Sequence, residues 1–148
     1  MAVEASVDGA TEYRPCEVTL VDGTVQDRVY VQEATRWFSV WGVDPEDDHG
    51  KVLVPVERIA QIAESPTRLP ARFATRMYAA GESMMGGCLF RLVLRDGSHL
   101  DCLTGNAVDF VAWPPGIGPQ DVVDLVPHEG RMSQHIEQPR YAWALYDD

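Results

Sequence analysis

The chain has 148 residues, of which 23 are acidic, 12 are basic and 45% are hydrophobic, and its formal net charge is −11. A chain of this length buries about 68–70% of its unfolded surface, so a hydrophobic core can form without a disulfide or a metal. This composition excludes collagen-like, coiled-coil and disordered chains. The apolar runs are too short for a membrane span, and residues 1–11 lack the basic residues of a signal peptide. We therefore expect a cytoplasmic protein without a membrane partner.

The charge is distributed unevenly along the chain. Residues 58–95 hold six arginines and two acidic residues, whereas residues 1–57 and 96–148 carry net charges of −8 and −7. Because nonspecific nucleic-acid binding depends on basic residues that neutralise phosphates, we expect no nucleic-acid partner. Two interpretations of the basic segment remain open. Either the acidic arms fold around it and neutralise it, or it binds an anionic ligand or an acidic partner.

The three cysteines are Cys16, Cys88 and Cys102, and their spacing does not match the C-x-x-C pattern of a zinc site. Each stands beside apolar residues with strand-like alternation, where a cysteine behaves as a small buried hydrophobe. We therefore expect buried thiols rather than disulfides, and we expect neither a metal nor another cofactor.

Residues 1–14 show no hydrophobic periodicity, which is typical of a flexible acidic tail. A β-hairpin is predicted next, because Asp22-Gly23 suits a tight turn with positive φ angles and separates two alternating apolar stretches. We expect Leu20 to lie opposite Val25. This register places five apolar side chains on one face: Val18, Leu20, Val25, Val29 and Val31.

Two further strands are predicted before residue 57. Residues 36–43 would form a third strand, with Trp37 and Trp41 on one face and Phe38 on the other. Residues 51–56 would form a fourth, which Pro55 limits to an edge or a strand end. For residues 57–64 two structures remain open: one helical turn, or a 3₁₀ turn followed by a short strand.

Residues 69–80 are the clearest predicted helix, since Pro70 suits its first turn and Gly81 suits its C-terminal cap. Its expected buried stripe, at helical spacing, consists of Leu69, Phe73, Met77 and Ala80. Three arginines at four-residue intervals predict an adjacent basic ridge: Arg68, Arg72 and Arg76. Arginine is well suited to bidentate capture of carboxylates or phosphates, so this ridge is the strongest candidate binding site. The alternative is that it pairs with acidic residues of the same chain.

A glycine-rich connection at 81–87 leads to a second predicted hairpin at 88–103. Five side chains of this hairpin would point inward: Phe90, Leu92, Leu94, Leu100 and Cys102. A three-residue loop, 96–98, would place Leu94 opposite Leu100. The six residues that end in Asp96-Gly97 resemble those that end in Asp22-Gly23, which shared turn chemistry explains.

The remainder of the chain contains shorter predicted elements. Residues 107–113 are predicted as a short strand, and residues 121–126 as a last short strand or a single helical turn. Residues 127–148 form a polar extension whose aromatic end is expected to dock. The whole pattern predicts a single globular domain at 15–126, between the N-terminal tail and this extension.

Part of this pattern resembles a known fold family. The resemblance rests on Val18 and Leu20, the Asp22-Gly23 turn, the returning Val25 and Val29, and the sequence from Val54-Pro55 to Ile59 and Ile62. Over residues 15–64 this order resembles the small Sm-like or SH3-like β-barrels, although Asp27 stands where Sm-like chains usually have a glycine. The resemblance implies a strongly bent sheet or partial barrel. The RNA binding typical of Sm-like rings is not expected here, because the chain is acidic.

The candidate catalytic patterns in the sequence lack residues that their chemistry needs. Ser83 lies in a G-x-S context, but Met85 replaces the second glycine of a nucleophile elbow, and the segment follows a helix instead of a strand. The acidic cluster at 44–49 lacks the glycine and glutamate of a calcium loop. The four histidines do not have zinc-site spacing. We therefore assign no catalytic residue and favour a non-catalytic function over an enzymatic one.

Taken together, the sequence predicts a β-rich α+β domain: a bent sheet or partial barrel, one central helix at about 69–80 and a second hairpin at about 88–103. The predicted function is non-catalytic binding of a protein partner through charged surfaces, as in an adaptor, inhibitor or immunity-type module. The alternative is an enzyme or a small anionic-ligand-binding protein with a pocket where the helix meets the glycine-rich loop. Association of copies through strand edges is a third hypothesis. The candidate binding residues are Arg68, Arg72, Arg76, Glu82, Ser83, Arg91 and Arg95.

Overall fold

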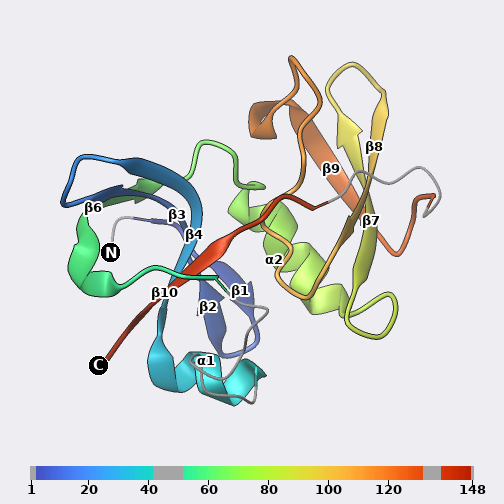
Figure 1. Cartoon of the computed structure of the whole chain (residues 1–148). Helices are drawn as coiled ribbons and strands as arrows, with labels where there is room; N and C mark the ends of the chain where they lie inside the picture. The colour runs from blue at the N-terminus through green and yellow to red at the C-terminus, as the bar shows by residue number, and fades with distance from the viewer. Residues whose placement is uncertain (1–2, 42–51, 132–137, 148) are drawn as a thin grey trace. The chain divides into compact units, whose positions relative to one another are not determined.

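The structure is a computed structural model that describes residues 3–41, 52–131 and 138–147 (Figure 1). These residues form two helices and ten strands in three sheets, so the predicted β-rich α+β class is confirmed. The described strands do not close or strongly curl any of the three sheets, and the expected partial barrel is therefore not seen. None of the described helices is long and apolar enough to cross a membrane.

Contacts between residues group the chain into two compact units, where the sequence predicted one domain at 15–126. Unit 1 contains Met1–Ala5, Ala10–Pro66 and Arg140–Asp148. Unit 2 contains Ser6–Gly9 and Thr67–Pro139. Two short strands occur within residues 1–14, where a flexible tail was expected: β1 (Ser6–Asp8) and β2 (Thr11–Tyr13). Val3 and Ser6 are buried, which explains why this segment is ordered.

Unit 1 is built on a five-stranded sheet with the order β5-β10-β4-β3-β6. In that order the strands are Val52–Leu53, Ala142–Tyr146, Val25–Glu33, Pro15–Leu20 and Ile59–Glu64. The aromatic C-terminal segment docks as expected, and it does so as β10, which runs parallel to both β4 and β5. The last residues of the chain therefore complete a sheet that the first hairpin begins.

Both faces of this sheet carry a core. On one face, Val18, Leu20, Val29 and Val31 pack with Val3, Val54 and the alanines of β10. The other face carries an aromatic cluster, in which the rings of Tyr30 and Trp143 stack with centroids 4.7 Å apart. Burial on both faces explains why β4 contains four consecutive buried residues at 29–32.

The register of the first hairpin differs from the expected one. Val25 lies opposite Thr19 instead of Leu20, and it is 58% exposed. A β-bulge then restores the pattern, since two residues of β4 oppose Glu17 and one of them, Arg28, has a φ of 60°. The bulge returns the β4 side chains beyond it to the buried face, so Val29 is inward while Val25 is not.

Residues 36–43 were predicted as a strand, and this prediction is wrong for the described part. Helix α1 spans Ala34–Trp41, and residues 42–43 lie outside the described residues. Trp37 is completely buried, with its ring 6.2 Å from that of Trp143 in an edge-to-face arrangement. This contact joins residues more than one hundred positions apart, so local alternation could not reveal it.

The fourth predicted strand is shorter than expected, since only Val52–Leu53 of residues 51–56 forms β5 within the described part. For residues 57–64 the second alternative is confirmed. A 3₁₀ turn at Val56–Arg58 follows Pro55 and leads into β6. The Pro55 backbone has the extended conformation that precedes this turn, which is consistent with the fixed φ of proline.

Unit 2 contains the second hairpin, with β7 (Cys88–Leu94) and β8 (His99–Thr104), and β9 (Val122–Pro127) on the other side of β7. Helix α2 (Ala71–Ala80) contacts β9 and β1. It confirms the predicted helix at 69–80 except for its first two residues, which precede the helix. Gly81 ends it with a φ of 80°, which a residue with a side chain rarely adopts. The predicted stripe is buried except for Ala80, which is exposed at the last position of the helix.

The second hairpin has the predicted inward face but a different register. Leu92 lies opposite Leu100, and Leu94 donates to the carbonyl oxygen of Ser98 at 2.8 Å. The loop is therefore 95–97 instead of 96–98. Because the shift is two residues, every side chain keeps its face, and β7 alternates strictly between buried and half-buried positions.

Residues 107–113 do not form the predicted strand, and within the described chain they contribute only an isolated bridge between Phe110 and Arg68. The segment is nevertheless buried from Ala107 to Val111. Its apolar residues fill the core, and the buried Asp109 takes part in side-chain hydrogen bonds instead of a sheet. Residues 121–126, left open between strand and turn, are mostly strand, since β9 begins at Val122 after a 3₁₀ turn at Pro119–Asp121.

The two hairpins are more alike than their sequences indicated. Leu20 and Leu94 occupy the same place, and each donates its backbone N–H at 2.8 Å to the carbonyl oxygen four residues later. Gly23 and Gly97 have φ angles of 89° and 88°. Both hairpins therefore turn through a three-residue loop whose last position needs a glycine.

The likeness extends to a third strand in each unit. A 3₁₀ turn precedes β6 and another precedes β9, and both strands return antiparallel to the first strand of their hairpin. The pairings Val18–Ile62 and Leu92–Leu125 are equivalent. Both registers shift by one residue at the last pair, which is Leu20–Ile59 in unit 1 and Leu94–Val122 in unit 2. Each unit thus contains the same three-stranded module, so shared turn chemistry alone does not explain the resemblance between the hairpins.

Candidate functional site

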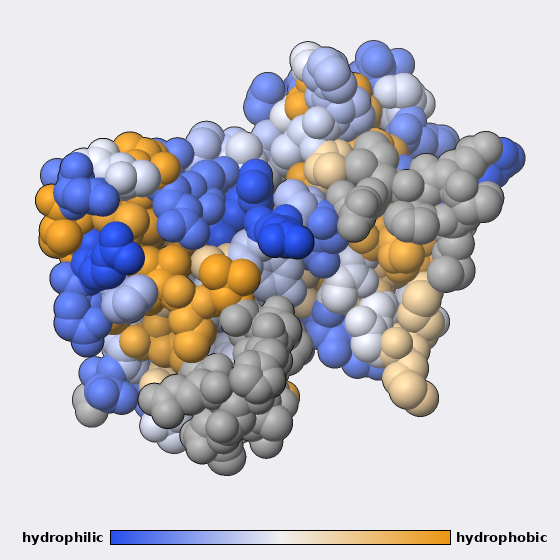
Figure 2. Space-filling model, in the orientation of Figure 1, coloured by the Kyte–Doolittle hydropathy of each residue, from blue (hydrophilic) through white to orange (hydrophobic). Residues whose placement is uncertain are grey.

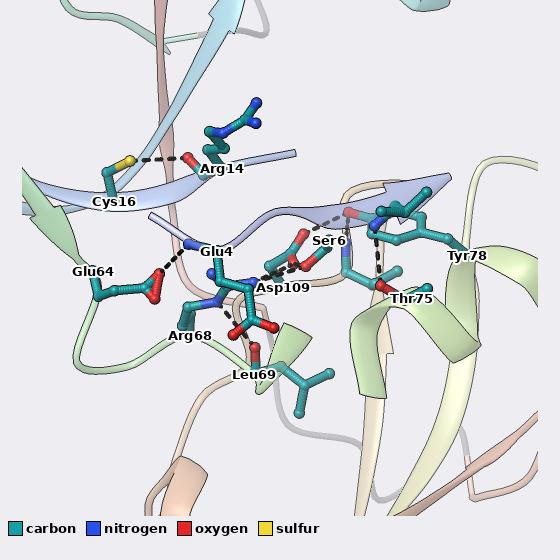
Figure 3. A network of polar contacts seen from close by, with 12 residues as sticks. Glu4, Ser6, Arg14, Cys16, Glu64, Arg68, Leu69, Thr75, Tyr78 and Asp109 are labelled. Carbon is teal, nitrogen blue, oxygen red and sulfur yellow. Dashed lines mark hydrogen bonds and ion pairs between the residues drawn. The ribbon is translucent and has the colours of Figure 1, made fainter. Parts of the chain in front are cut away.

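The predicted basic ridge is not a continuous surface. Arg68 lies before α2, not on it, and only 6% of the residue is exposed. Its guanidinium donates to the hydroxyl of Ser6 at 2.9 Å and lies 4.0 Å from the carboxylate of Asp109 (Figure 3). Arg68 is therefore part of the interior of unit 2, because its position outside the helix turns it inward.

Asp109 is the centre of this buried network. One of its carboxylate oxygens accepts a hydrogen bond from Ser6, and the other accepts from the Tyr78 hydroxyl at 2.6 Å (Figure 3). The Tyr78 oxygen also accepts from the backbone N–H of Val108 at 3.1 Å. A buried carboxylate is tolerated only with such partners, so this network has a structural role in unit 2.

Arg72 and Arg76 do lie on the exposed side of α2. The guanidinium of Arg72 lies 4.4 Å from the centre of the Phe73 ring. Arg76 is bound to the carboxylate of Asp124, and it donates to the carbonyl oxygen of Leu125 at 3.0 Å. The hydrogen bond from Arg76 lowers the pKa of Asp124. Arg76 thus joins α2 to β9, as the hypothesis of neutralisation within the chain predicts.

The two remaining candidate arginines are also bound within unit 2. Arg91 lies opposite Asp101 on the hairpin and donates to its carboxylate at 2.8 Å. This hydrogen bond lowers the pKa of Asp101 and raises that of Arg91. Arg95 donates to the carbonyl oxygen of Gln120 at 2.8 Å. The contacts of the predicted arginines therefore lie at separate places in the unit.

Ser83 has a neighbour that the sequence did not reveal. Its Oγ lies 2.7 Å from Nδ1 of His128, and the other ring nitrogen of His128 lies 3.2 Å from the carbonyl oxygen of Ala80. If Nε2 carries the proton and donates to Ala80, Nδ1 accepts from the Ser83 hydroxyl. His128 has a φ of 61°, which is uncommon for a residue with a side chain. Glu82, the neighbouring candidate, is exposed and accepts from the Gly86 backbone at 3.4 Å.

Each unit has an open cavity among its described residues, and these two cavities lie away from the predicted junction of α2 with the glycine-rich loop. The cavity in unit 1 has a volume of about 230 Å³ and is lined mainly by polar residues: Ala10, Glu12, Arg14, Gln32, Glu33, Arg36 and Tyr146. The cavity in unit 2 has a volume of about 330 Å³ and lies beside the second turn, against Leu94, Arg95, Asp96, Gly116, Ile117 and Asp121. Both cavities are partly open to solvent.

The described residues contain no group of three or more His, Cys, Asp or Glu side chains that could hold a metal ion. The acidic cluster at 44–49 and His135 lie outside the described residues. All three cysteines are buried thiols. Burial raises the pKa of Cys102 to about 12, and together with the charge of Glu82 it raises the pKa of Cys88. Both shifts favour the protonated thiol, which is the less reactive form.

A partly exposed apolar surface of the described core lies along β6, at the edge of the unit 1 sheet. Ile62 lies opposite the buried Val18 and is 38% exposed, and Ile59 packs at the border of the same core. Glu64 lies on the same face, and one of its carboxylate oxygens accepts from the backbone N–H of Glu4 at 3.0 Å. We call these four residues, Glu4, Ile59, Ile62 and Glu64, the β6 face. Figure 2 shows orange apolar and blue hydrophilic residues intermixed at the left of the view, where Figure 1 labels β6.

Sequence reasoning missed the Asp109 network, the Ser83–His128 contact and the β6 face, because all three join residues distant in sequence. For the β6 face, the one sequence feature that pointed to it was the alternative in which residues 57–64 form a 3₁₀ turn followed by a short strand. No family model, curated protein or solved structure matches the chain. Its function is therefore inferred from its own residues.

Proposed function

We propose that this protein is a non-catalytic, cytoplasmic binding protein that recognises a protein partner through its charged surface. The observation that carries the proposal is that several of the chain's arginines are hydrogen-bonded within the chain. Six of them donate to acceptors of their own unit: Arg14, Arg28, Arg68, Arg76, Arg91 and Arg95. With these cations bound internally and a net charge of −11, the charge available to a partner is mainly acidic.

This distribution favours a basic partner. Complementary charge accelerates association and discriminates against wrong partners, and its effect weakens as salt screens the surface. The predicted use of the arginine ridge receives less support, because Arg68 is buried and Arg76 is bound to Asp124. Within the candidate set, Arg72 keeps an exposed guanidinium over the Phe73 ring.

The proposal is tested with the tagged full chain. Proteins captured from an extract of its own cells are identified, expressed, purified and titrated against the chain by calorimetry at low and high salt. We expect a basic protein that binds with fixed stoichiometry and more weakly as the salt concentration rises. If no purified candidate binds directly, or if the affinity does not depend on salt, the proposal is wrong.

The contact between Ser83 and His128 favours a second candidate function, that of an acyl-transfer enzyme. A nucleophile, a base within hydrogen-bond reach and a third group that orients the base are the parts that such chemistry requires. Ser83 Oγ would bond to the carbonyl carbon of an ester while its proton passes to Nδ1 of His128. The bond to the leaving alcohol would break, the alcohol would take that proton, and water would then hydrolyse the acyl-serine.

This candidate is tested by labelling with a fluorophosphonate and by hydrolysis of p-nitrophenyl acetate. Ser83→Ala and His128→Ala should both abolish labelling and hydrolysis, whereas Ser98→Ala, in the exposed second turn, should have no effect. Wild-type protein that reacts no faster than Ser83→Ala would exclude the enzyme. In that case Ser83 serves as a local cap, since its Oγ also accepts from the backbone N–H of Leu89 at 2.8 Å.

A further inference from the structure

Because the two modules are equivalent, the third strand of unit 2, β9, can be compared with the third strand of unit 1, β6. In unit 2, helix α2 contacts β9, and Leu125 and Val122 are only 2% and 3% exposed. Arg76 of the helix reaches the carbonyl oxygen of Leu125 and the carboxylate of Asp124. The helix thus contributes both an apolar stripe and an arginine to the strand that it covers.

The equivalent strand of unit 1 lacks such a cover among the described residues. Ile62 occupies the place of Leu125 but is 38% exposed, and Ile59 occupies the place of Val122 but is only partly buried. Five of the six residues of β6 are exposed. A solvated edge strand needs no explanation by itself, but here Ile62, which lies on its core face, is partly exposed to solvent.

The charge around this surface indicates the chemistry of an occupant. Glu64 lies on the same face as Ile62, Glu4 lies beside Glu64, and Glu57 precedes the strand. Arg58 is the one basic residue between Glu57 and Glu64. An occupant with an apolar stripe flanked by basic residues would therefore bury Ile62 and meet the carboxylates.

We propose that the β6 face binds a basic amphipathic helix of the protein partner, as α2 covers β9 in unit 2. This inference rests on the proposed function and names the surface and the element that recognise each other. The helix would place apolar side chains on Ile59 and Ile62 and an arginine or lysine near Glu64. A helix is the favoured occupant because the equivalent strand in the same chain is covered by one, and because the charges are complementary.

The probe is a synthetic peptide of residues 67–81, which contains α2 with Arg72 and Arg76 on its exposed side and Phe73 and Met77 on its buried side. The ¹⁵N-labelled full chain is titrated with this peptide to about 1 mM, which detects even weak binding. We expect shift changes concentrated at 59–64 and at the neighbouring residues of β3. A peptide with Phe73→Ser and Met77→Ser should cause none.

Variants of the full chain provide matched controls within one sheet. Ile62→Ser should weaken peptide binding at least about tenfold, whereas Val25→Ser, on the opposite face and 58% exposed, should leave it unchanged. Glu64→Lys should also weaken binding, and Glu17→Lys, on the opposite face, should not. Urea midpoints equal to that of the wild type show that each variant is folded.

Three results would overturn the inference: no shift changes at β6, equal affinity for Ile62→Ser and wild type, or a dimer in light scattering that Ile62→Ser dissociates. The last would mean that a second copy occupies the surface. These failures are distinguishable from failure of the proposed function. If a purified partner binds in calorimetry but is insensitive to Ile62→Ser and Glu64→Lys, the binding function stands and the β6 face is not its site.

Discussion

The hydroxyl of Tyr78 donates to a carboxylate oxygen of Asp109 at 2.6 Å, and both residues are buried. This bond fixes α2 to the segment that follows the second hairpin. Asp109→Ala should lower the free energy of unfolding by about 3–5 kcal/mol, because it removes the carboxylate that bridges the buried Ser6 and Tyr78 hydroxyls beside Arg68. Tyr78→Phe should cost about 1.5–3 kcal/mol, the range for a hydrogen bond to a charged group. Urea denaturation measures both, and a cost below about 1 kcal/mol for Asp109→Ala would contradict the structural role of the network.

Two arginines of the predicted ridge should respond differently to the same change. Arg68→Glu should lower the free energy of unfolding by at least about 3 kcal/mol, because it places a second carboxylate beside the buried Asp109. Arg72→Glu should change it by no more than about 0.5 kcal/mol, because Arg72 lies on the exposed side of α2. Thermal or urea unfolding of the two variants measures both changes in the free energy of unfolding. Equal effects would show that Arg68 is not buried as described. If the expected difference is seen, a binding test of the ridge should change Arg72 and leave Arg68 intact.

The equivalence of the two modules predicts equal costs at their turns. Gly23→Ala and Gly97→Ala should each destabilise the protein by about 1–2 kcal/mol, because alanine is strained at the φ angles of 89° and 88°. In both cases the added Cβ would meet open space, so the cost is conformational and not steric. Unfolding curves of the two variants measure it. A large cost at only one of the two glycines would contradict equivalent turns.

Gln32 is buried, and neither its amide nitrogen nor its oxygen has a hydrogen-bond partner among the described residues. Gln32→Met should raise the free energy of unfolding by about 1–3 kcal/mol, because a similar volume is kept while the unpaired polar atoms are removed. Gln26→Met, at a half-buried position of the same strand, serves as the control and should have little effect. If Gln32→Met is destabilising, the carboxamide has a bonding role that burial alone does not indicate.

The hairpin pair of Arg91 and Asp101 predicts how stability depends on pH. The hydrogen bond from Arg91 holds the folded pKa of Asp101 below its ordinary value of 3.8. Its contribution is therefore fully present above about pH 4 and is lost as the pH falls through the folded pKa. The urea midpoint of the wild type should decrease between pH 5 and acid pH, and the decrease should be smaller for Asp101→Asn. An identical decrease in the variant would mean that other carboxylates, such as Asp124, account for it.

Helix α2 and the second hairpin could be predicted from the sequence because their signals are local. Pro70 and Gly81 mark the ends of the helix, and alternation identifies the inward face of β7 even though the register was wrong by two residues. The same reasoning failed at residues 36–41, because the burial of Trp37 depends on Trp143. It also failed at Val25, because the bulge at Arg28 changes which face of β4 points inward.

Local chemistry in the sequence was enough to predict where both Asp-Gly turns lie, though not their registers, and to predict the central helix, the burial of the cysteines and the acidic net charge. Each of these depends on residues within a few positions of one another or on composition. The tertiary structure decided the rest: that Arg68 is internal, that Ser83 meets His128, that β10 completes the first sheet and that Ile62 is left at the surface. These arrangements depend on which distant segments bury one another, and a side chain's chemistry does not specify the distant neighbour that it will meet.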